Sequence, residues 1–223
     1  MGPGTTVLDL GCGAGSFARA AVGRGARVTG MDVDPAAVAQ AAADVPEAAF
    51  AVGDARYPPA GRFDVVAAVQ LLMHVAAPVD VLRAAARAGG IVVATVWGRP
   101  EECDLRAIGE ALAPWVDPRR LSGDPAPITD PARLAAVAGE AGLVVERIDE
   151  VICPFDHADE DELLDEVFAS AIGRAAGRRA GPSAVRSAVL ERLAPYRTAA
   201  GGYRLENVCR LLLARPARPP SQF

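Results

Sequence analysis

Short apolar runs alternate with amphipathic segments through the first half of the chain. The apolar runs predict buried strands, and the segments between them carry apolar residues at helical spacing. The predicted strands cover residues 5–10, 26–32, 48–54, 62–70 and 91–97, and the predicted helices cover residues 15–25, 34–45 and 77–90. Strands separated by helices of about 10 to 15 residues indicate βαβ units and a mainly parallel sheet.

The second half of the chain has a different pattern. Helices are predicted over residues 103–113, 130–142, 158–175 and 182–195, and strands over residues 143–155 and 201–216. The helices at 103–113 and 158–195 have no place in a simple βαβ sheet. We expect residues 99–130 and 156–200 to form helical insertions that act as a lid over the carboxyl ends of the strands, where such sheets bind ligands. Residues 217–223 are predicted to be a loose tail.

Composition narrows the classes of function. The chain has 223 residues, is 51% hydrophobic and carries a formal charge of -5, so no nucleic-acid partner is expected. All 23 basic residues are Arg, which excludes a mechanism based on a lysine amine. The apolar runs are too short for a signal peptide or a membrane span, so we expect a cytoplasmic protein without a membrane partner.

The cysteines do not form a recognisable framework. Cys12, Cys103, Cys153 and Cys209 are far apart in the sequence, and the chain has only two histidines. Neither a zinc site nor a disulfide set is expected from this spacing. We expect reduced cytoplasmic thiols and no metal.

The candidate chemistry begins with "VLDLGCGAGSF" at residues 7–17, where a predicted strand reaches Asp9 and glycines follow at alternate positions. Glycine lets a backbone approach a ligand closely, but "GAGSFA" (13–18) also passes as a degraded dinucleotide motif. Asp9 distinguishes a dinucleotide site from a site for a cationic ligand. A carboxylate at this position would repel a pyrophosphate, whereas it suits a positively charged group. Asp32 ends the next predicted strand and suits a ribose diol in either case. The alternative is a purely structural role, in which the glycines serve only the packing of the turn and Asp9 caps the adjacent helix.

The segment "LDLGCGAG" (8–15) resembles the first motif of the class I S-adenosylmethionine-dependent methyltransferases. Similar resemblances follow at "VTGMDVDP" (28–35), "AVGDA" (51–55), "RFDVVAAVQLLMHV" (62–75) and "AGGIVVATVWG" (88–98), and looser ones reach the end of the chain. The resemblance implies one domain over residues 1–223, with residues 1–98 as its cofactor-binding half. It also implies an α/β fold, with a Rossmann-like seven-stranded, mainly parallel sheet, its last strand antiparallel, and helices on both faces.

The resemblance further implies which residues bind S-adenosylmethionine. Asp32 would hold the ribose hydroxyls beside Val33, Asp54 would meet the adenine amino group, and Gln70 and Leu71 would line the methionine side. Cys12 would contribute only its backbone. The full set of expected cofactor-binding residues is Asp9, Gly11, Cys12, Gly13, Gly15, Asp32, Val33, Asp54, Ala55, Gln70 and Leu71.

The expected reaction is methyl transfer by in-line displacement to an oxygen, nitrogen or carbon of a small-molecule acceptor. In such a reaction the protein mainly aligns the nucleophile and excludes water. After the fourth strand the chain has "VQLLMH", and not the Asn/Asp-Pro-Pro-aromatic motif of DNA amino-methyltransferases. The Pro-Cys nucleophile of the pyrimidine C5 enzymes and the paired glutamates of the arginine enzymes are also missing, which leaves a small-molecule acceptor.

Several residues are candidates for contact with the acceptor. His74 follows the fourth strand and is the candidate general base, with packing or hydrogen bonding in the loop as the alternative. His157 lies beside an acidic run and is interpreted as a solvated helix start. Trp97, Phe155 and Tyr203 fall at strand ends, where lining of the substrate pocket and burial in the core are both open.

Two other functions stay open from the sequence. A nicotinamide-dependent oxidoreductase is disfavoured by Asp9 and by the missing Tyr-x-x-x-Lys pair, whereas a non-catalytic module that binds S-adenosylmethionine is not excluded. The first strand begins at about Thr5, although the family usually carries one or two helices before it. We expect that the start lies further upstream, or that the inserted helices or a second subunit of a homodimer supply the cover.

Overall fold

The computed structural model of the protein describes residues 1–116 and 128–217, without the side chain of residue 171. The chain divides into two compact units. Unit 1 comprises the described residues of Met1–Val96, Ile128–Glu150 and Arg210–Phe223, and unit 2 comprises those of Trp97–Pro127 and Val151–Cys209. The predicted tail beyond residue 217 and residues 117–127 of the first predicted insertion lie outside the described residues.

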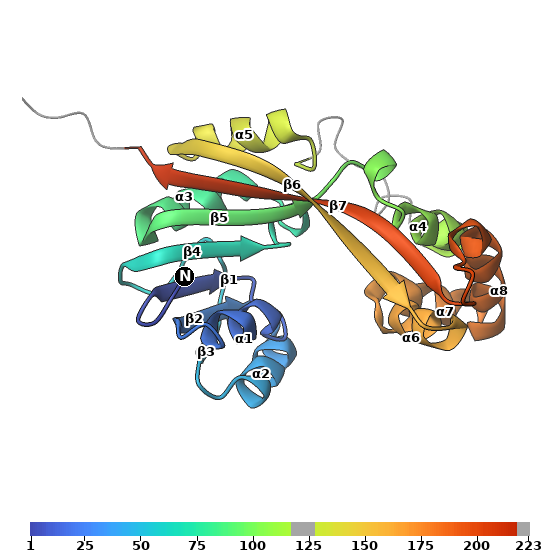
Figure 1. Ribbon diagram of the computed structural model, residues 1–223. Helices are drawn as coiled ribbons and strands as arrows, with labels where there is room; N and C mark the ends of the chain where they lie inside the picture. The colour runs from blue at the N-terminus through green and yellow to red at the C-terminus, as the bar shows by residue number, and fades with distance from the viewer. Residues whose placement is uncertain (117–127, 218–223) are drawn as a thin grey trace, which may run out of the picture. The chain divides into compact units, whose positions relative to one another are not determined.

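A seven-stranded sheet has the order β3-β2-β1-β4-β5-β7-β6 (Figure 1). Its strands are β1 (Thr6–Leu10), β2 (Arg27–Asp32), β3 (Ala49–Val52), β4 (Phe63–Val69), β5 (Gly89–Trp97), β6 (Leu143–His157) and β7 (Tyr203–Pro216). The first five strands pair in parallel. The arrow of β7 points opposite to those of β4 and β5, so the predicted mainly parallel sheet with an antiparallel last strand is confirmed.

Four helices connect the strands of unit 1: α1 (Ser16–Val22), α2 (Pro35–Asp44), α3 (Pro78–Ala88) and α5 (Pro131–Glu140). α2 begins where the sequence predicts, because the Asp34 carboxylate accepts a hydrogen bond from Ala36 N at 2.9 Å and Pro35 occupies the first turn. Asp130 and Pro131 start α5 in the same way. A short 3-10 helix, η1 (Leu72–His74), follows β4.

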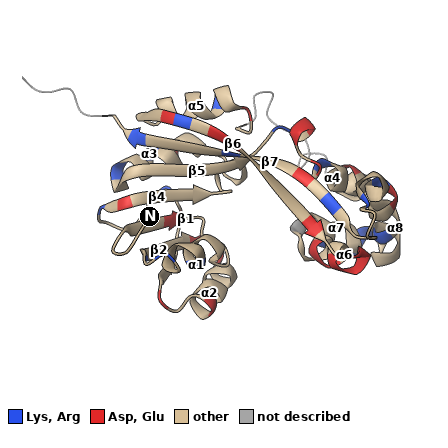
Figure 2. Ribbon diagram, in the orientation of Figure 1, with Lys and Arg blue, Asp and Glu red and all other residues tan. Residues whose placement is uncertain are grey.

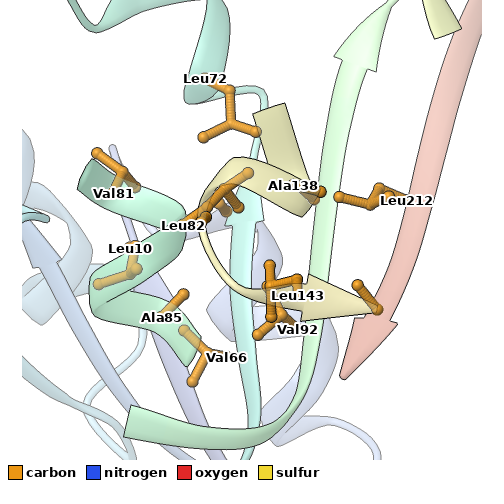
Figure 3. Close-up of a cluster of buried hydrophobic side chains, with 14 of the residues drawn as sticks. Leu10, Val66, Leu72, Val81, Leu82, Ala85, Val92, Ala138, Leu143 and Leu212 are labelled. Carbon is orange, nitrogen blue, oxygen red and sulfur yellow. The ribbon is translucent and has the colours of Figure 1, made fainter. Parts of the chain in front are cut away.

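Alternating residues of the central strands pack on opposite faces of the sheet. Val7 and Val65 pack with Ala18 and Ala21 of α1 on one face. The other face forms the main core of unit 1 with α3 and α5, and Figure 3 shows part of it. Its labelled side chains are Leu10, Val66, Leu72, Val81, Leu82, Ala85, Val92, Ala138, Leu143 and Leu212. The predicted helices on both faces are therefore present.

Unit 2 has a hydrophobic core of its own, built from helices and the outer parts of β6 and β7. Its helices are α4 (Arg106–Leu112), α6 (Glu160–Ala169), α7 (Ala171–Ala180) and α8 (Pro182–Leu193), with short 3-10 helices η2 (Pro100–Glu102), η3 (Ala113–Trp115) and η5 (Ala194–Tyr196). The helices predicted as insertions thus form one compact unit. Their role as a lid stays a prediction.

The single helix predicted over residues 158–175 is wrong. Two helices occupy this stretch, and Ser170 lies between them in an extended conformation (φ -72°, ψ 154°). The Ser170 hydroxyl accepts a hydrogen bond from Gly173 N at 3.0 Å and donates one to the Val167 carbonyl at 2.6 Å. Ser170 therefore caps the start of α7 and ends α6.

Charged residues are sparse on the central strands of unit 1 (Figure 2). β1, β4 and β5 carry only Asp9 and Asp64 between them. The Asp64 carboxylate lies at the amino end of β4, where Thr6 N and Thr6 Oγ1 each donate to its Oδ2 at 2.8 Å. No helix within the described ranges combines the length and apolar composition needed to cross a bilayer.

Candidate functional site

The glycine-rich loop joins β1 to α1 and is held against the end of β2. Gly11 N and Cys12 N donate to the Met31 carbonyl at 2.8 and 2.9 Å. Gly11, Gly13 and Gly15 have φ values of 69°, 50° and 84°, a region that side chains rarely adopt. The alternate glycines therefore satisfy the backbone geometry of a tight loop at the carboxyl edge of the sheet.

The three glycines differ in what surrounds them. A Cβ at Gly11 would lie 2.6 Å from Leu71 Cδ1, and one at Gly15 would lie 3.1 Å from Ala41 Cβ on α2. A Cβ at Gly13 would meet no atom within 4 Å. A side chain at Gly11 or Gly15 would thus crowd Leu71 or Ala41, whereas Gly13 borders open space.

Asp9 is a buried acid with no partner. Its side chain is 1% exposed, and neither carboxylate oxygen has a hydrogen-bond partner within the part of the chain that the structure describes. Burial, and secondarily the negative charge of Asp32, raise the pKa of Asp9 from 3.8 to about 7. Asp9 does not cap α1, because the residue at that cap is Gly15 and no side chain bonds there. A buried, unpartnered carboxylate is suited to a cationic group of a ligand.

Asp32 connects two loops at the same edge. Its carboxylate accepts hydrogen bonds from Gly13 N at 2.9 Å and from Asp34 N at 3.0 Å. Each carboxylate oxygen has a second lone pair, so Asp32 can hold the glycine loop and still accept from a diol.

Asp54 lies beyond β3 and is paired with Arg56. Arg56 Nε lies 3.1 Å from both carboxylate oxygens, and Arg56 Nη2 lies 2.6 Å from Oδ2. This hydrogen bonding is the main cause that lowers the pKa of Asp54. The carboxylate is therefore ionised and oriented by a neighbour that sequence reasoning missed.

A pocket of about 240 Å³ lies within unit 1 between these loops. Six predicted cofactor-binding residues line it: Gly11, Asp32, Val33, Asp54, Ala55 and Leu71. Six further lining residues were missed: Gly53, Arg56, Val75, Ala76, Ala77 and Val81. Gly53 and Arg56 flank Asp54, and residues 75–77 follow η1, so widening each predicted segment by a few residues would have found most of them.

The other predicted site residues of unit 1 are not among the residues that line this pocket. Gln70 has a φ of 53°, unusual for a residue other than glycine, and its N–H donates to the Thr95 carbonyl at 3.0 Å. Cys12 is buried, and burial with the nearby Asp9 and Asp32 charges raises the pKa of its thiol to about 12. His74 ends η1 with an exposed side chain.

The three aromatic candidates belong to unit 2. Trp97 and Phe155 meet edge to face, with ring centroids 5.7 Å apart at 79°. Tyr203 is 2% exposed and lies in the core of unit 2. Of the two environments that the sequence left open, Tyr203 is in the core. Lining of the substrate pocket by Trp97 and Phe155 stays a prediction.

The setting of His157 differs from the one predicted. Its interpretation as a solvated helix start is wrong, because it is the last residue of β6 and is 5% exposed. Its Nε2 lies 3.1 Å from Glu166 Oε2, whose side chain is exposed. His157 and Phe155 both line a second pocket, of about 310 Å³, which lies within unit 2.

Comparison with known proteins identifies the family. A family model described as a methyltransferase domain matches residues 8–94, which run from β1 to β5. The ubiquinone biosynthesis O-methyltransferase of Pseudomonas paraeruginosa is 35% identical over 157 residues, covering 65% of this chain and 67% of that protein. The corresponding protein of Thiobacillus denitrificans is 34% identical over 158 residues, with the same coverage of both chains. The chain belongs to the class I S-adenosylmethionine-dependent methyltransferases.

Solved structures confirm the fold of this methyltransferase. The [4+2]-cyclase SpnF has a TM-score of 0.62 at 20% identity, covering 98% of this chain and 78% of that one. The magnesium protoporphyrin IX methyltransferase of Synechocystis, with S-adenosylhomocysteine bound, has a TM-score of 0.55 at 16% identity, covering 96% and 75%. A cyclase shares the fold, so the fold alone does not determine the reaction, and the family assignment rests on the sequence relatives. S-adenosylmethionine is the cofactor, and neither the oxidoreductase nor the non-catalytic module is favoured.

Proposed function

We propose that this methyltransferase transfers a methyl group to an oxygen atom of a small-molecule acceptor, and that the pocket of unit 1 holds its cofactor. Support for an oxygen comes from relatives named as O-methyltransferases that match 65% of the chain. The cytoplasmic location and the homodimer stay predictions from the sequence.

The observation that carries the cofactor assignment is Asp9. A dinucleotide pyrophosphate would bring negative charge to a carboxylate that already has no partner, whereas the methionine ammonium of S-adenosylmethionine would neutralise it. A Cβ at Gly13 would meet no atom within 4 Å, and the cofactor would pass this open side of the loop. Asp32 would accept from the ribose hydroxyls, and Asp54 from the adenine amino group.

S-adenosylmethionine supplies an activated methyl group on a sulfonium, so little covalent chemistry is left to the protein. Asp9 and Asp32 fix the orientation of the bound molecule through charge-assisted hydrogen bonds. Leu71, Val75 and Val81 form an apolar part of the pocket wall, which would help to keep water from the reacting atoms. The acceptor hydroxyl must lose a proton as its oxygen is methylated, and an imidazole nitrogen of His74 is the proposed acceptor of that proton.

Two measurements test the proposal. Calorimetric titration of S-adenosylhomocysteine against NAD distinguishes the two cofactor classes, and tighter binding of NAD would overturn the assignment. An acceptor screen with radiolabelled S-adenosylmethionine, followed by identification of the methylated atom, tests the reaction. A product labelled at nitrogen or carbon would contradict transfer to oxygen.

Asp32→Ala is expected to weaken S-adenosylhomocysteine binding by about 100-fold or more. The variant loses two charge-assisted hydrogen bonds to the ribose diol, each worth about 1.5–3 kcal/mol. It also frees Gly13 N, so the glycine loop loses an anchor. Calorimetry measures the dissociation constant, and an unchanged value would remove Asp32 from the site.

Asp34→Ala is the matched control for Asp32→Ala. Asp34 lies two residues away, is exposed and caps α2 through Ala36 N. The control should cost about 1 kcal/mol of stability through the lost cap while leaving the dissociation constant nearly unchanged.

His74→Ala is expected to lower kcat by about 100-fold and to leave the affinity for S-adenosylhomocysteine unchanged. General bases contribute about 100- to 10,000-fold, and His74 is not among the residues that line the proposed cofactor pocket. Added imidazole should restore part of the rate if a missing base is the cause. A fall in kcat below about threefold would assign His74 a role in the loop alone.

A further inference from the structure

Arg56 and Asp54 both line the pocket of unit 1. They belong to the turn after β3, in which Arg56 N donates to Asp54 Oδ1 at 2.9 Å and Tyr57 N donates to the Asp54 carbonyl at 2.8 Å. This turn anchors the backbone of Arg56 beside the Asp54 carboxylate.

The guanidinium of Arg56 is held from two directions. Its Nε and Nη2 donate to the Asp54 carboxylate, and its central carbon lies 5.6 Å from the centre of the Tyr57 ring, within the range of a cation–π contact. The Arg56 side chain is nevertheless 45% exposed, so a ligand can reach it. Because arginine stays protonated in proteins, this group is a hydrogen-bond donor at every working pH.

The hydrogen-bonding positions of the pair are used unequally. A guanidinium has about five N–H groups, and Asp54 accepts from two of them, on Nε and Nη2. Within residues 1–116 and 128–217, no other group accepts a hydrogen bond from the Arg56 side chain. The Asp54 carboxylate has about four lone-pair positions and already accepts from Arg56 N, Nε and Nη2. This part of the pocket wall therefore offers several donors beside a single remaining acceptor position.

An adenine ring carries the complementary groups. Its 6-amino group is a donor, and the ring nitrogens N1 and N7 on either side of that group are acceptors. The proposed function pairs the amino group with Asp54 and leaves both ring nitrogens without a side-chain donor. Arg56 has N–H groups to spare next to Asp54, as such a donor requires.

We propose that Arg56 is a specificity residue for the cofactor: an Nη–H group of Arg56 donates a hydrogen bond to an adenine ring nitrogen next to the 6-amino group, while Asp54 accepts from that amino group. The two side chains together recognise a donor beside an acceptor, the pattern that an asparagine amide recognises on adenine. The inference rests on the proposed function, because it requires the base of S-adenosylmethionine to lie in the pocket of unit 1.

The test compares loss of the ring nitrogen with loss of the arginine. Calorimetry on the full chain gives dissociation constants for S-adenosylhomocysteine and for its 1-deaza and 7-deaza analogues, in which a C–H group replaces one ring nitrogen. We expect one analogue to bind the wild type about tenfold more weakly than S-adenosylhomocysteine, the effect of one charge-assisted hydrogen bond.

Arg56→Met keeps an unbranched apolar side chain and removes the donors. An exposed ion pair contributes little to stability, so the variant should fold. If Arg56 binds the ring nitrogen, the same analogue and S-adenosylhomocysteine should bind this variant within about threefold of each other. The proposal is overturned if each analogue loses the same factor in both proteins, which is the result expected if Arg56 only orients Asp54 or stacks on the ring.

Arg19→Met is the matched control. Arg19 is an exposed arginine of α1 that pairs with Asp44 at 3.3 Å, and it is not among the residues that line the pocket. This variant should keep the tenfold difference between the analogue and S-adenosylhomocysteine, and loss of the difference would overturn the assignment to Arg56. Failure of the wild type to bind S-adenosylhomocysteine would instead overturn the proposed function, so the two failures are distinguishable.

Discussion

Asp9→Asn is expected to stabilise the protein at neutral pH and to remove most of its affinity for S-adenosylhomocysteine. The pKa of Asp9 is about 7 in the folded protein and 3.8 in an unperturbed chain. Below about pH 4 the Asp9 carboxyl is protonated in both the folded and the unfolded protein. Between about pH 4 and pH 7 it is protonated only in the folded protein. Stability is therefore lost as the pH rises through this window, and the cost is complete above about pH 7.

The size of this cost follows from the pKa difference. A shift of about three pH units corresponds to ~4 kcal/mol, since each unit is worth about 1.36 kcal/mol. Asn does not ionise, although its own buried amide offsets part of the gain, so a net stabilisation of about 2–3 kcal/mol is expected at pH 8. Thermal melts at pH 5 and pH 8 measure it, and the gap between variant and wild type should widen with pH. Parallel behaviour of the two proteins would contradict the shifted pKa.

The binding half of the prediction has its own pH dependence. A cationic ammonium favours ionised Asp9, so the wild type should release a proton on binding below pH 7. Its affinity should then fall by up to about tenfold per unit as the pH decreases, while Asp9→Asn binds weakly at every pH. Asp64→Asn is the control, because Asp64 bonds Thr6 at the other end of the sheet and should leave the affinity unchanged.

A stabilising effect of Asp9→Asn would show that the acid does not serve the stability of the fold, which favours an apolar residue at this position. Its neighbours Leu8 and Leu10 are fully buried in the core of unit 1. A residue that costs stability in the free protein and has no partner among the described residues is understood most simply as a contact to a ligand.

Sequence patterns predicted the central strands well because each buried run has sharp boundaries. β1 and β2 begin and end within one residue of the prediction, and Asp34 with Pro35 locates the start of α2. The resemblance to the methyltransferase family likewise predicted Gly11, Asp32 and Asp54 at one site, and all three line the pocket of unit 1, since parallel strands bring their carboxyl ends to one edge.

His157 shows why local composition can mislead. The acidic residues that follow it suggested solvent, but Phe155 and His157 share a strand face by their period of two, and both line the pocket of unit 2. That alternation was readable from the sequence. The Glu166 partner was not, because its position depends on how α6 packs against β6. Arg56 was missed for a similar reason, since its pairing with Asp54 is set by the turn after β3.

Gly13→Val is expected to abolish detectable S-adenosylhomocysteine binding, a loss of more than about 100-fold. The added side chain would project into the open space beside the loop, where no protein atom lies within 4 Å and where the methionine part of the cofactor is proposed to lie. The backbone strain is at least about 1–2 kcal/mol, because a φ of 50° is unfavourable for any side chain and more so for a β-branched one. The melting temperature should therefore fall by several degrees without loss of the fold, while binding is lost.

Gly15→Val is the control that separates the two roles of glycine in this loop. Its φ is 84°, and its Cβ would lie 3.1 Å from Ala41 Cβ, so the variant should lose stability through a clash with α2. Calorimetry and thermal melts on both variants give the comparison. A Gly13→Val protein that binds S-adenosylhomocysteine with wild-type affinity would show that the cofactor does not pass this loop, since a bulky branched side chain and a ligand cannot occupy the same volume.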